Sequence, residues 1–206
     1  MASEIRVYVE GGGDGKDTRS LVKKGFRAFL NDIAERGRPK RVRFDIIACG
    51  SIQSTVDDFN TALRTHPNAF NVLLVDSDGP VQSGILQHLL ERGRWNLSGI
   101  VGEDHCHLMV QVVEAWVVAD LAALQQFYGQ RFNSNSIPKN PNVEELDRNT
   151  LYSSLKAATR MTQKGEYHKT RHAPELLKRV DVSKVRRAAP HCERLLTTLE
   201  KRIDAV

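Results

Sequence analysis

The chain has 206 residues, of which 40% are hydrophobic and 27% are charged, so it is long enough for one buried core and has the balance of a globular rather than a disordered protein. It contains no apolar stretch long enough to cross a bilayer, no basic-then-apolar leader and only three scattered cysteines, and we therefore expect a cytoplasmic protein without a membrane partner. The net charge of +5 is concentrated in residues 151–206, which contain 13 Lys and Arg against 6 Asp and Glu, and this distribution fits either a polyanionic partner or a solvated helical surface.

Strand and helix patterns alternate along the first 130 residues. Ser54 and Asp57, three residues apart, form a variant capping box that predicts the start of one helix. The predicted strands cover 5–10, 42–49, 70–76 and 105–111, and the predicted helices cover 18–36, 54–65, 85–93 and 112–128. This order predicts an α/β fold, in which parallel strands are joined by right-handed crossovers and flanked by helices.

The composition changes after this alternating part. Residues 131–150 are rich in Asn, Ser and Pro, and they predict a loop or insertion. The rest of the chain has helical patterns, with Pro174 and Pro190 placed near the starts of the last two helices. We therefore expect a core over 1–130, the loop over 131–150, and a basic helical extension over 151–206 that packs on the core.

Carboxylates stand where two of the predicted strands end. The first strand runs into Glu10 and a glycine-rich stretch, and the third ends on Asp76-Ser77-Asp78. Ligands of open parallel sheets sit at the carboxyl ends of the strands, where these side chains would converge. With a period of two, Asp76 and Asp78 would point to the same side and share one cation, and such oxygen ligands suit Mg²⁺ or Mn²⁺. The alternative is a turn in which the aspartates bond to local amides.

Two further acidic residues are candidate metal ligands. Glu114 follows the fourth predicted strand, although it could equally interact with the dipole of the helix that it opens. Asp14 lies in the glycine-rich stretch directly after Glu10. That stretch is not a nucleotide-binding loop of the Walker A type, because Glu10 and Asp17 stand where glycine and Ser or Thr are needed.

Basic residues of the C-terminal part are candidates for contacts with a phosphate backbone. Lys169 lies in a run of basic and imidazole side chains beside Tyr167, and it could stabilise a leaving phosphate. A solvated helix start explains the same run equally well. The other candidates for nucleic-acid binding are Lys164, Arg171, Arg186 and Arg187.

The order strand, Glu10, glycine-rich loop, then strand and Asp76-x-Asp78 resembles the Toprim domain of topoisomerases, bacterial primases and the nuclease half of OLD-type defence proteins. The chain is still more similar to stand-alone Toprim-like proteins of a family named only as a domain of unknown function, and to RloB-like proteins. The segments that carry this resemblance are Val9-Glu10-Gly11, Val75-Asp76-Ser77-Asp78, Glu114-Ala115-Trp116 with Ala119-Asp120, and Tyr167-x-Lys169.

The resemblance implies a metal-dependent nuclease. Glu10 would be the general acid/base or a metal ligand, Asp76 and Asp78 would hold Mg²⁺ or Mn²⁺, and Lys169 would serve the phosphate. It also implies an ABC-type ATPase partner in anti-phage defence. The substrate, DNA or RNA, and a homo-oligomeric state are left open by the sequence.

The sequence also allows two alternatives to a nuclease. The segment Val72 to Gly79 is similar to the nucleophile motif of haloacid-dehalogenase-type phosphatases, in which Asp76 would form a phospho-aspartate and Asp78 would act as acid/base. The third class is a catalytically silent subunit that binds nucleic acid or docks on an ATPase. Substitution of Glu10 separates the first two, because a nuclease of this type would lose its activity and a phosphatase would keep it.

Overall fold

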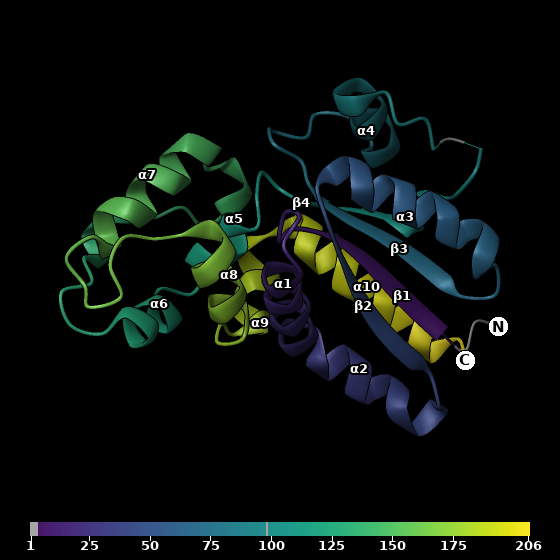
Figure 1. Cartoon of the computed structure of the whole chain (residues 1–206), viewed down its shortest axis with the longest axis horizontal. Coiled ribbons are helices and arrows are strands. Elements are labelled where there is room, and N and C mark those ends of the chain that lie inside the picture. Colours follow the sequence, from purple (N-terminus) through teal and green to yellow (C-terminus); the bar gives the residue numbers. More distant parts are fainter. Residues whose placement is uncertain (1–3, 98) are drawn as a thin grey trace.

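Four parallel strands form one sheet in the computed structural model, which describes residues 4–97 and 99–206 (Figure 1). The strands are β1 (Glu4–Glu10), β2 (Arg43–Gly50), β3 (Phe70–Asp76) and β4 (Cys106–Met109), and their order in the sheet is β2-β1-β3-β4. This confirms the predicted α/β class with a parallel sheet flanked by helices, an arrangement consistent with a Toprim-like fold.

The two central strands are the ones that end on carboxylates. β1 pairs with β2 on one side and with β3 on the other, with Val9 opposite Leu74. Every residue of β3 is buried, as expected where helices cover both faces of a parallel sheet. Because β1 and β3 are parallel neighbours in close register, Glu10 and Asp76 arrive at the same edge of the sheet.

Helices cover both faces of the sheet. On one face lie α1 (Lys16–Phe29), α2 (Asn31–Gly37) and α10 (Pro190–Asp204), and on the other lie α3 (Ile52–Thr65) and α4 (Ile85–Gly93) (Figure 1). The alternation of side chains along a strand divides the core accordingly: Val72 and Leu74 belong to the first cluster, and Leu73 belongs to the second.

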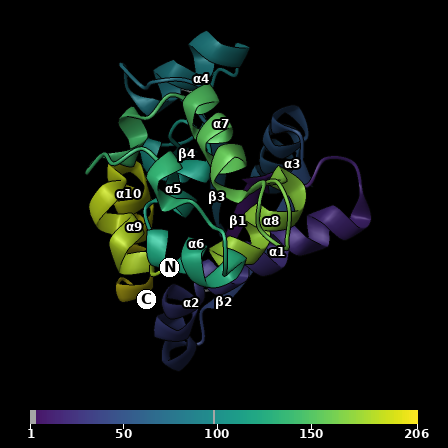
Figure 2. The same ribbon diagram turned by 90° about the vertical axis from the view of Figure 1, so that its left-hand side faces the viewer.

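The remaining helices gather beside the sheet and are seen from the front in Figure 2. They are α5 (Glu114–Val118), α6 (Leu121–Tyr128), α7 (Arg148–Thr159), α8 (Lys169–Leu177) and α9 (Val182–Ala188). Their apolar residues, Trp116 and Leu176 among them, belong to the same buried cluster as the first face of the sheet. Helix α8 lies directly against α1, where a Cβ on Gly25 would come within 2.8 Å of the carbonyl oxygen of Pro174.

Two long helices predicted from the sequence are each divided into two. The predicted helix 18–36 is α1 and α2, separated at Leu30, whose backbone N–H still bonds to the carbonyl of Phe26. The predicted helix 112–128 is α5 and α6, because the Asp120 carboxylate accepts a hydrogen bond from the Ala123 N–H and starts a new helix there. Asx capping of this kind favours a helix start over a helix interior.

Three local predictions need correction. Helix α3 is capped by Ser51, whose hydroxyl accepts from the Ser54 N–H, so the helix starts before the predicted capping box. Pro190 does open α10, but Pro174 lies inside α8, where a proline forfeits a backbone hydrogen bond. The segment 131–150 is more ordered than a plain loop, since it contains the 3₁₀ turns Ser134–Ser136 and Val143–Glu145 and the start of α7.

Two other 3₁₀ turns, Arg38–Lys40 and Glu103–His105, complete the assigned elements. Within the described residues, none of the helices combines the length and the apolar character that a bilayer crossing requires.

Candidate active site

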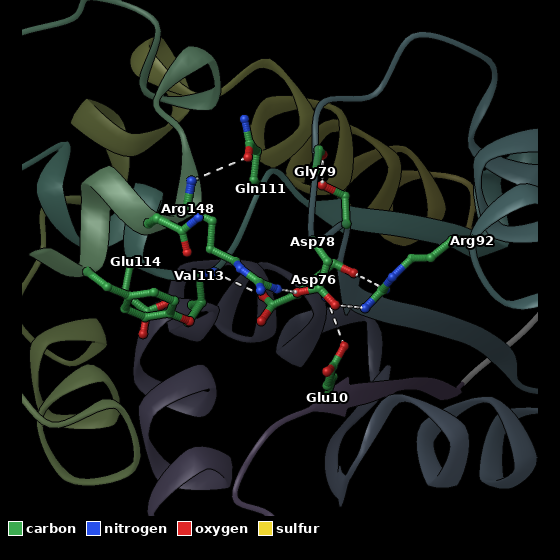
Figure 3. A network of polar contacts seen from close by, with 12 residues as sticks. Glu10, Asp76, Asp78, Gly79, Arg92, Gln111, Val113, Glu114 and Arg148 are labelled. Atoms are coloured by element: carbon green, nitrogen blue, oxygen red, sulfur yellow. Dashed lines mark hydrogen bonds and ion pairs between the residues drawn. The ribbon is translucent and has the colours of Figure 1, made fainter.

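Glu10 and Asp76 meet at the carboxyl edge of the sheet. The register of β1 shifts between Val9 and Glu10, and the Glu10 side chain turns toward β3. Its Oε2 accepts a hydrogen bond of 3.1 Å from the backbone N–H of Asp76 (Figure 3). The structure therefore brings together the two residues that head the predicted site.

The Asp76 carboxylate is buried and partnered on both oxygens. Its residue is 3% exposed, its Oδ1 accepts from the Val113 N–H at 2.9 Å, and its Oδ2 lies 3.0 Å from the Nζ of Lys169. Burial raises the pKa of Asp76, and the charge of Lys169 opposes that rise. The predicted partner residue Lys169 thus joins the cluster from α8, 93 residues along the chain.

Asp78 is held by two arginines. It lies beyond the end of β3 in the left-handed conformation, with φ of 54°, so the period of two that was expected to align it with Asp76 does not extend this far. One carboxylate oxygen pairs with Arg92 and the other lies 2.9 Å from an Nη of Arg148 (Figure 3). Arg92 also donates to the carbonyl oxygen of Asp76.

Glu114 reaches the same cluster from the first turn of α5, although it is fully buried. Its Oε1 accepts from the hydroxyl of Tyr167 at 2.7 Å, and its Oε2 lies 3.9 Å from the Nζ of Lys169. Among the described residues, Oε2 finds no hydrogen-bond partner. The Nζ of Lys169 also donates to the hydroxyl of Tyr152 at 3.0 Å, so one ammonium group connects two carboxylates and a phenol.

The electrostatics of this cluster suit proton transfer near neutral pH. Burial raises the pKa of Glu10 to about 7, and the neighbouring Asp76 carboxylate adds to the rise. Burial also raises the pKa of Glu114. For Lys169, burial lowers the pKa, but the carboxylates of Asp76 and Glu114 outweigh this and raise it. Glu10 is therefore poised to exchange a proton, and Lys169 stays charged.

A cavity of about 230 Å³ opens beside the carboxylates. It lies between the glycine-rich loop after β1, helix α1 and helix α8. Glu10, Asp76 and Lys169 form its charged end. A charged group of perturbed pKa at the end of a concave site is typical of places where chemistry occurs.

The donor atoms at this edge are carboxylate oxygens, the atom type that a hard divalent cation requires. Glu10 and Asp76 adjoin, and the Oε2 of Glu114 is buried without a partner among the described residues; carboxylate oxygens are the ligands that Mg²⁺ and Mn²⁺ prefer. As the side chains are placed, however, the described residues contain no group of three His, Cys, Asp or Glu arranged to hold a metal ion. Lys169 and the two arginines take the places next to Asp76 and Asp78.

Asp14, His105 and His107 are placed apart from this cluster. Asp14 is exposed on the glycine-rich loop, and the described residues that line the cavity do not include it. His105 ends the 3₁₀ turn before β4 and His107 lies near the start of β4, at the opposite end of the strand from the site. Nδ1 of His105 is 2.7 Å from the carbonyl oxygen of Asn71, and His107 is bonded to Arg194. Their contacts are structural.

The other basic candidates are spread over the helical extension. The Nζ of Lys164 lies 4.8 Å from the centre of the Phe127 ring. Arg171 is exposed on α8, and Arg187 lies on a different helix, α9. Arg186 bridges two acidic side chains of α10. The structure thus brings Lys169 alone of the predicted basic residues into contact with the carboxylates of the cluster.

Three residues of the cluster were missed by the sequence reasoning: Arg92, Arg148 and Tyr152. Arg92 is 14 residues and Arg148 is 70 residues from Asp78, and neither stands in a motif. The one available signal is that Arg148 and Tyr152 are four residues apart, the spacing of one helical face, but Arg148 lies within the predicted loop 131–150 and not on a predicted helix.

Residues 9–200 of the chain match the model of the family described as domain of unknown function DUF4276, and the chain belongs to that family. No curated protein and no solved structure matches it. The match covers every residue of the cluster described above, from Glu10 to Lys169.

Proposed function

We propose that this DUF4276 protein hydrolyses phosphodiester bonds of a nucleic acid at the edge formed by Glu10 and Asp76. The observation that carries the proposal is the hydrogen bond from the backbone N–H of Asp76 to the Glu10 carboxylate, with the Asp76 carboxylate ion-paired to Lys169, beside a cavity at the carboxyl edge of a parallel sheet. The resemblance of the two strand ends to the Toprim domain supports the same reading.

In this proposal Glu10 is the general acid/base. Burial raises its pKa to about 7, and a pKa that lies near the working pH favours proton transfer. Glu10 takes a proton from the attacking water as the new bond to phosphorus forms. The bond to the leaving oxygen then breaks, that oxygen takes up a proton from solvent, and Glu10 returns its own proton to solvent.

Lys169 is the proposed partner of the substrate phosphate. Its ammonium group is partly exposed, with 43% of the side chain accessible, while the Asp76 side chain is 5% accessible. A phosphate oxygen can therefore approach Lys169 from solvent, and a fixed positive charge at that place stabilises charge that develops on the phosphate.

Asp76 would hold a Mg²⁺ or Mn²⁺ ion, with Asp78 as a second ligand once its ion pairs with Arg92 and Arg148 open. When bound, such an ion lowers the pKa of the attacking water and offsets the charge of the phosphate. The proposal therefore includes a rearrangement of Asp78 and its two arginines before the metal site is complete.

A second function is favoured by the same ion pairs. Asp76 and Asp78 are both neutralised by basic side chains, which suits a catalytically silent subunit that binds nucleic acid or an ABC-type ATPase. In this alternative the chain would show no metal-dependent turnover by itself.

Cleavage assays separate these functions. Labelled tRNA, plasmid DNA and single-stranded DNA are incubated with Mg²⁺ or Mn²⁺ and with the wild type, Glu10→Gln, Asp76→Asn, or Asp17→Asn as a control in the first turn of α1. We expect cleavage by the wild type and the control, and a loss of about 100-fold or more in the other two variants.

The contrary outcomes point to different alternatives. A wild type that binds nucleic acid but does not cleave it under any of these conditions would favour the silent subunit. Hydrolysis of a small phosphomonoester that survives Glu10→Gln but not Asp76→Asn would favour the phosphatase. Circular dichroism of each variant excludes loss of folding as the cause.

A further inference from the structure

The cavity beside Glu10 and Asp76 has two chemically different ends. Glu10, Asp76 and Lys169 form one end, and apolar side chains of α1 and α8 form the other. The apolar end is lined by Val22, Phe26, Ala173, Pro174 and Leu177.

We propose that this cavity receives one unpaired nucleotide of the substrate strand, so that the protein acts on single-stranded or bulged nucleic acid and not on continuous duplex. The inference rests on the proposed phosphodiester hydrolysis, because that reaction places a phosphate at the charged end. The sugar and base joined to that phosphate then extend along the apolar walls.

The size of the cavity limits the occupant to one such group. Its volume of about 230 Å³ is below the range of about 300–1,000 Å³ that is usual for drug-sized ligands. We therefore expect it to take a single base, and not a base pair or two stacked bases. A nucleotide within a duplex must be unstacked and unpaired before it enters such a pocket, at a cost of about a few kcal/mol, whereas a nucleotide in a single strand or bulge is already free.

The residues that line the cavity also indicate that it does not discriminate between bases. Among the described residues that line its apolar end and rim, Thr170 is the one with a polar side chain. Discrimination between bases needs hydrogen bonds to their edges, whereas contact with a base face is tolerant of sequence. We therefore expect a preference for unpaired nucleotides with little preference among the four bases.

Cleavage of three labelled substrates with the same sequence tests the inference: a single strand, its perfect duplex, and a duplex with one bulged nucleotide. We expect the single strand and the bulged duplex to be cleaved at least about tenfold faster than the perfect duplex, with the bulged duplex cut at the bulge.

A variant that fills the cavity provides the second arm. Thr170 is partly exposed at the rim, and Thr170→Trp should place an indole in the space of the nucleotide. Thr61→Trp, on the exposed surface of α3, is the matched control. We expect Thr170→Trp to raise KM for the single strand at least about fivefold, the size of one lost stacking contact, and Thr61→Trp to leave it unchanged.

A binding measurement keeps the inference independent of turnover. Calorimetry with dAMP and with deoxyribose 5-phosphate, on the wild type and both tryptophan variants, measures what the base adds. We expect dAMP to bind at least about fivefold more tightly than the sugar phosphate to the wild type and to Thr61→Trp, and this difference to vanish in Thr170→Trp.

The outcomes for the cavity and for the proposed function are distinct. Equal cleavage of the three substrates, together with an unchanged KM in Thr170→Trp, overturns the inference and leaves the nuclease standing. No cleavage of any substrate, together with a base-dependent affinity that Thr170→Trp removes, overturns the nuclease and supports a nucleotide pocket. Equal affinity of dAMP and the sugar phosphate for the wild type counts against the pocket.

Discussion

The ion pair between Lys169 and Asp76 is the contact of the candidate site whose removal has the clearest consequence for stability. In Lys169→Met, the Asp76 carboxylate keeps its bond from the Val113 N–H but loses the ammonium group 3.0 Å from its Oδ2. Glu114, fully buried, loses the same charge at 3.9 Å. Methionine preserves most of the side-chain volume, so the substitution removes charge more than packing.

The expected loss in the free energy of unfolding is about 2–3 kcal/mol. Removing one partner of a fully buried pair costs about 3–5 kcal/mol, and an exposed pair contributes about 0–1 kcal/mol. The Asp76 side chain is 5% exposed and the Lys169 side chain is 43% exposed, so solvent screens the lysine end and places the loss between those limits.

The loss should depend on pH in one direction. Burial already raises the pKa of Asp76, and Lys169 opposes that rise, so its removal raises this pKa further. The folded variant then keeps a proton that the unfolded chain releases near its ordinary pKa of 3.8. Stability that depends on this proton is present at low pH and is lost as the pH rises. The gap between wild type and Lys169→Met therefore widens as the pH rises above that ordinary value.

Equilibrium unfolding in urea with a chelator present measures this gap. Lys156→Met is the control, because Lys156 pairs with Glu166 at 3.2 Å on the surface, with both side chains more than half exposed; its loss should stay under about 1 kcal/mol. A change of less than about 0.5 kcal/mol in Lys169→Met at pH 8, or a gap that is constant with pH, would refute the reasoning.

Two further predictions concern the scaffold. Burial lowers the pKa of His107 to about 3, with Arg194 as the next cause. Between pH 3 and 6.5 the unfolded chain therefore binds a proton that the folded chain does not, and the free energy of unfolding falls as the pH falls through that window, by at most about 1.4 kcal/mol per pH unit. In His107→Asn, urea unfolding measured at several pH values should show a weaker loss of stability over this acid range. Gly12→Ala should destabilise the protein more than Gly13→Ala, because a Cβ at Gly12 (φ 88°) would lie 2.8 Å from backbone atoms of Arg19, whereas a Cβ at Gly13 (φ 54°) meets nothing within 4 Å. Thermal melts of the two variants measure this difference, and equal midpoints would contradict the steric argument.

The strand ends could be predicted from the sequence because they depend on local patterns and one general rule. Apolar β-branched runs mark β1 and β3, and in a parallel sheet their carboxyl ends share an edge. The observed bounds of β3, Phe70–Asp76, coincide with the predicted range. The contact of Glu10 with Asp76 follows from this placement without knowledge of any side-chain packing.

The basic half of the cluster could not be predicted in the same way. Arg92 comes from the last turn of α4 and Arg148 from the first residue of α7, and their meeting at Asp78 depends on how two helices dock on the sheet. Docking is set by apolar faces spread over many residues, which leave no spacing rule between an arginine and its partner. The left-handed turn at Asp78 was likewise invisible, because aspartate adopts that conformation without a distinctive neighbour.

The ion pairs at this edge impose a condition on what can bind there. A divalent cation that took Asp76 and Asp78 alone would leave Arg92 and Arg148 without their counter-charge and Lys169 with only the more distant carboxylate of Glu114. A phosphate that took the basic side chains alone would leave the buried Asp76 carboxylate unpaired, which is strongly unfavourable. When a cation and a phosphate bind together, the cation pairs with the carboxylates and the phosphate pairs with the basic side chains, so both halves of each broken ion pair regain a partner. Each ligand should therefore raise the affinity for the other by the same factor. The closed ion pairs are in this sense compatible with the proposed hydrolysis, because they oppose occupation by either ligand alone and favour occupation by both.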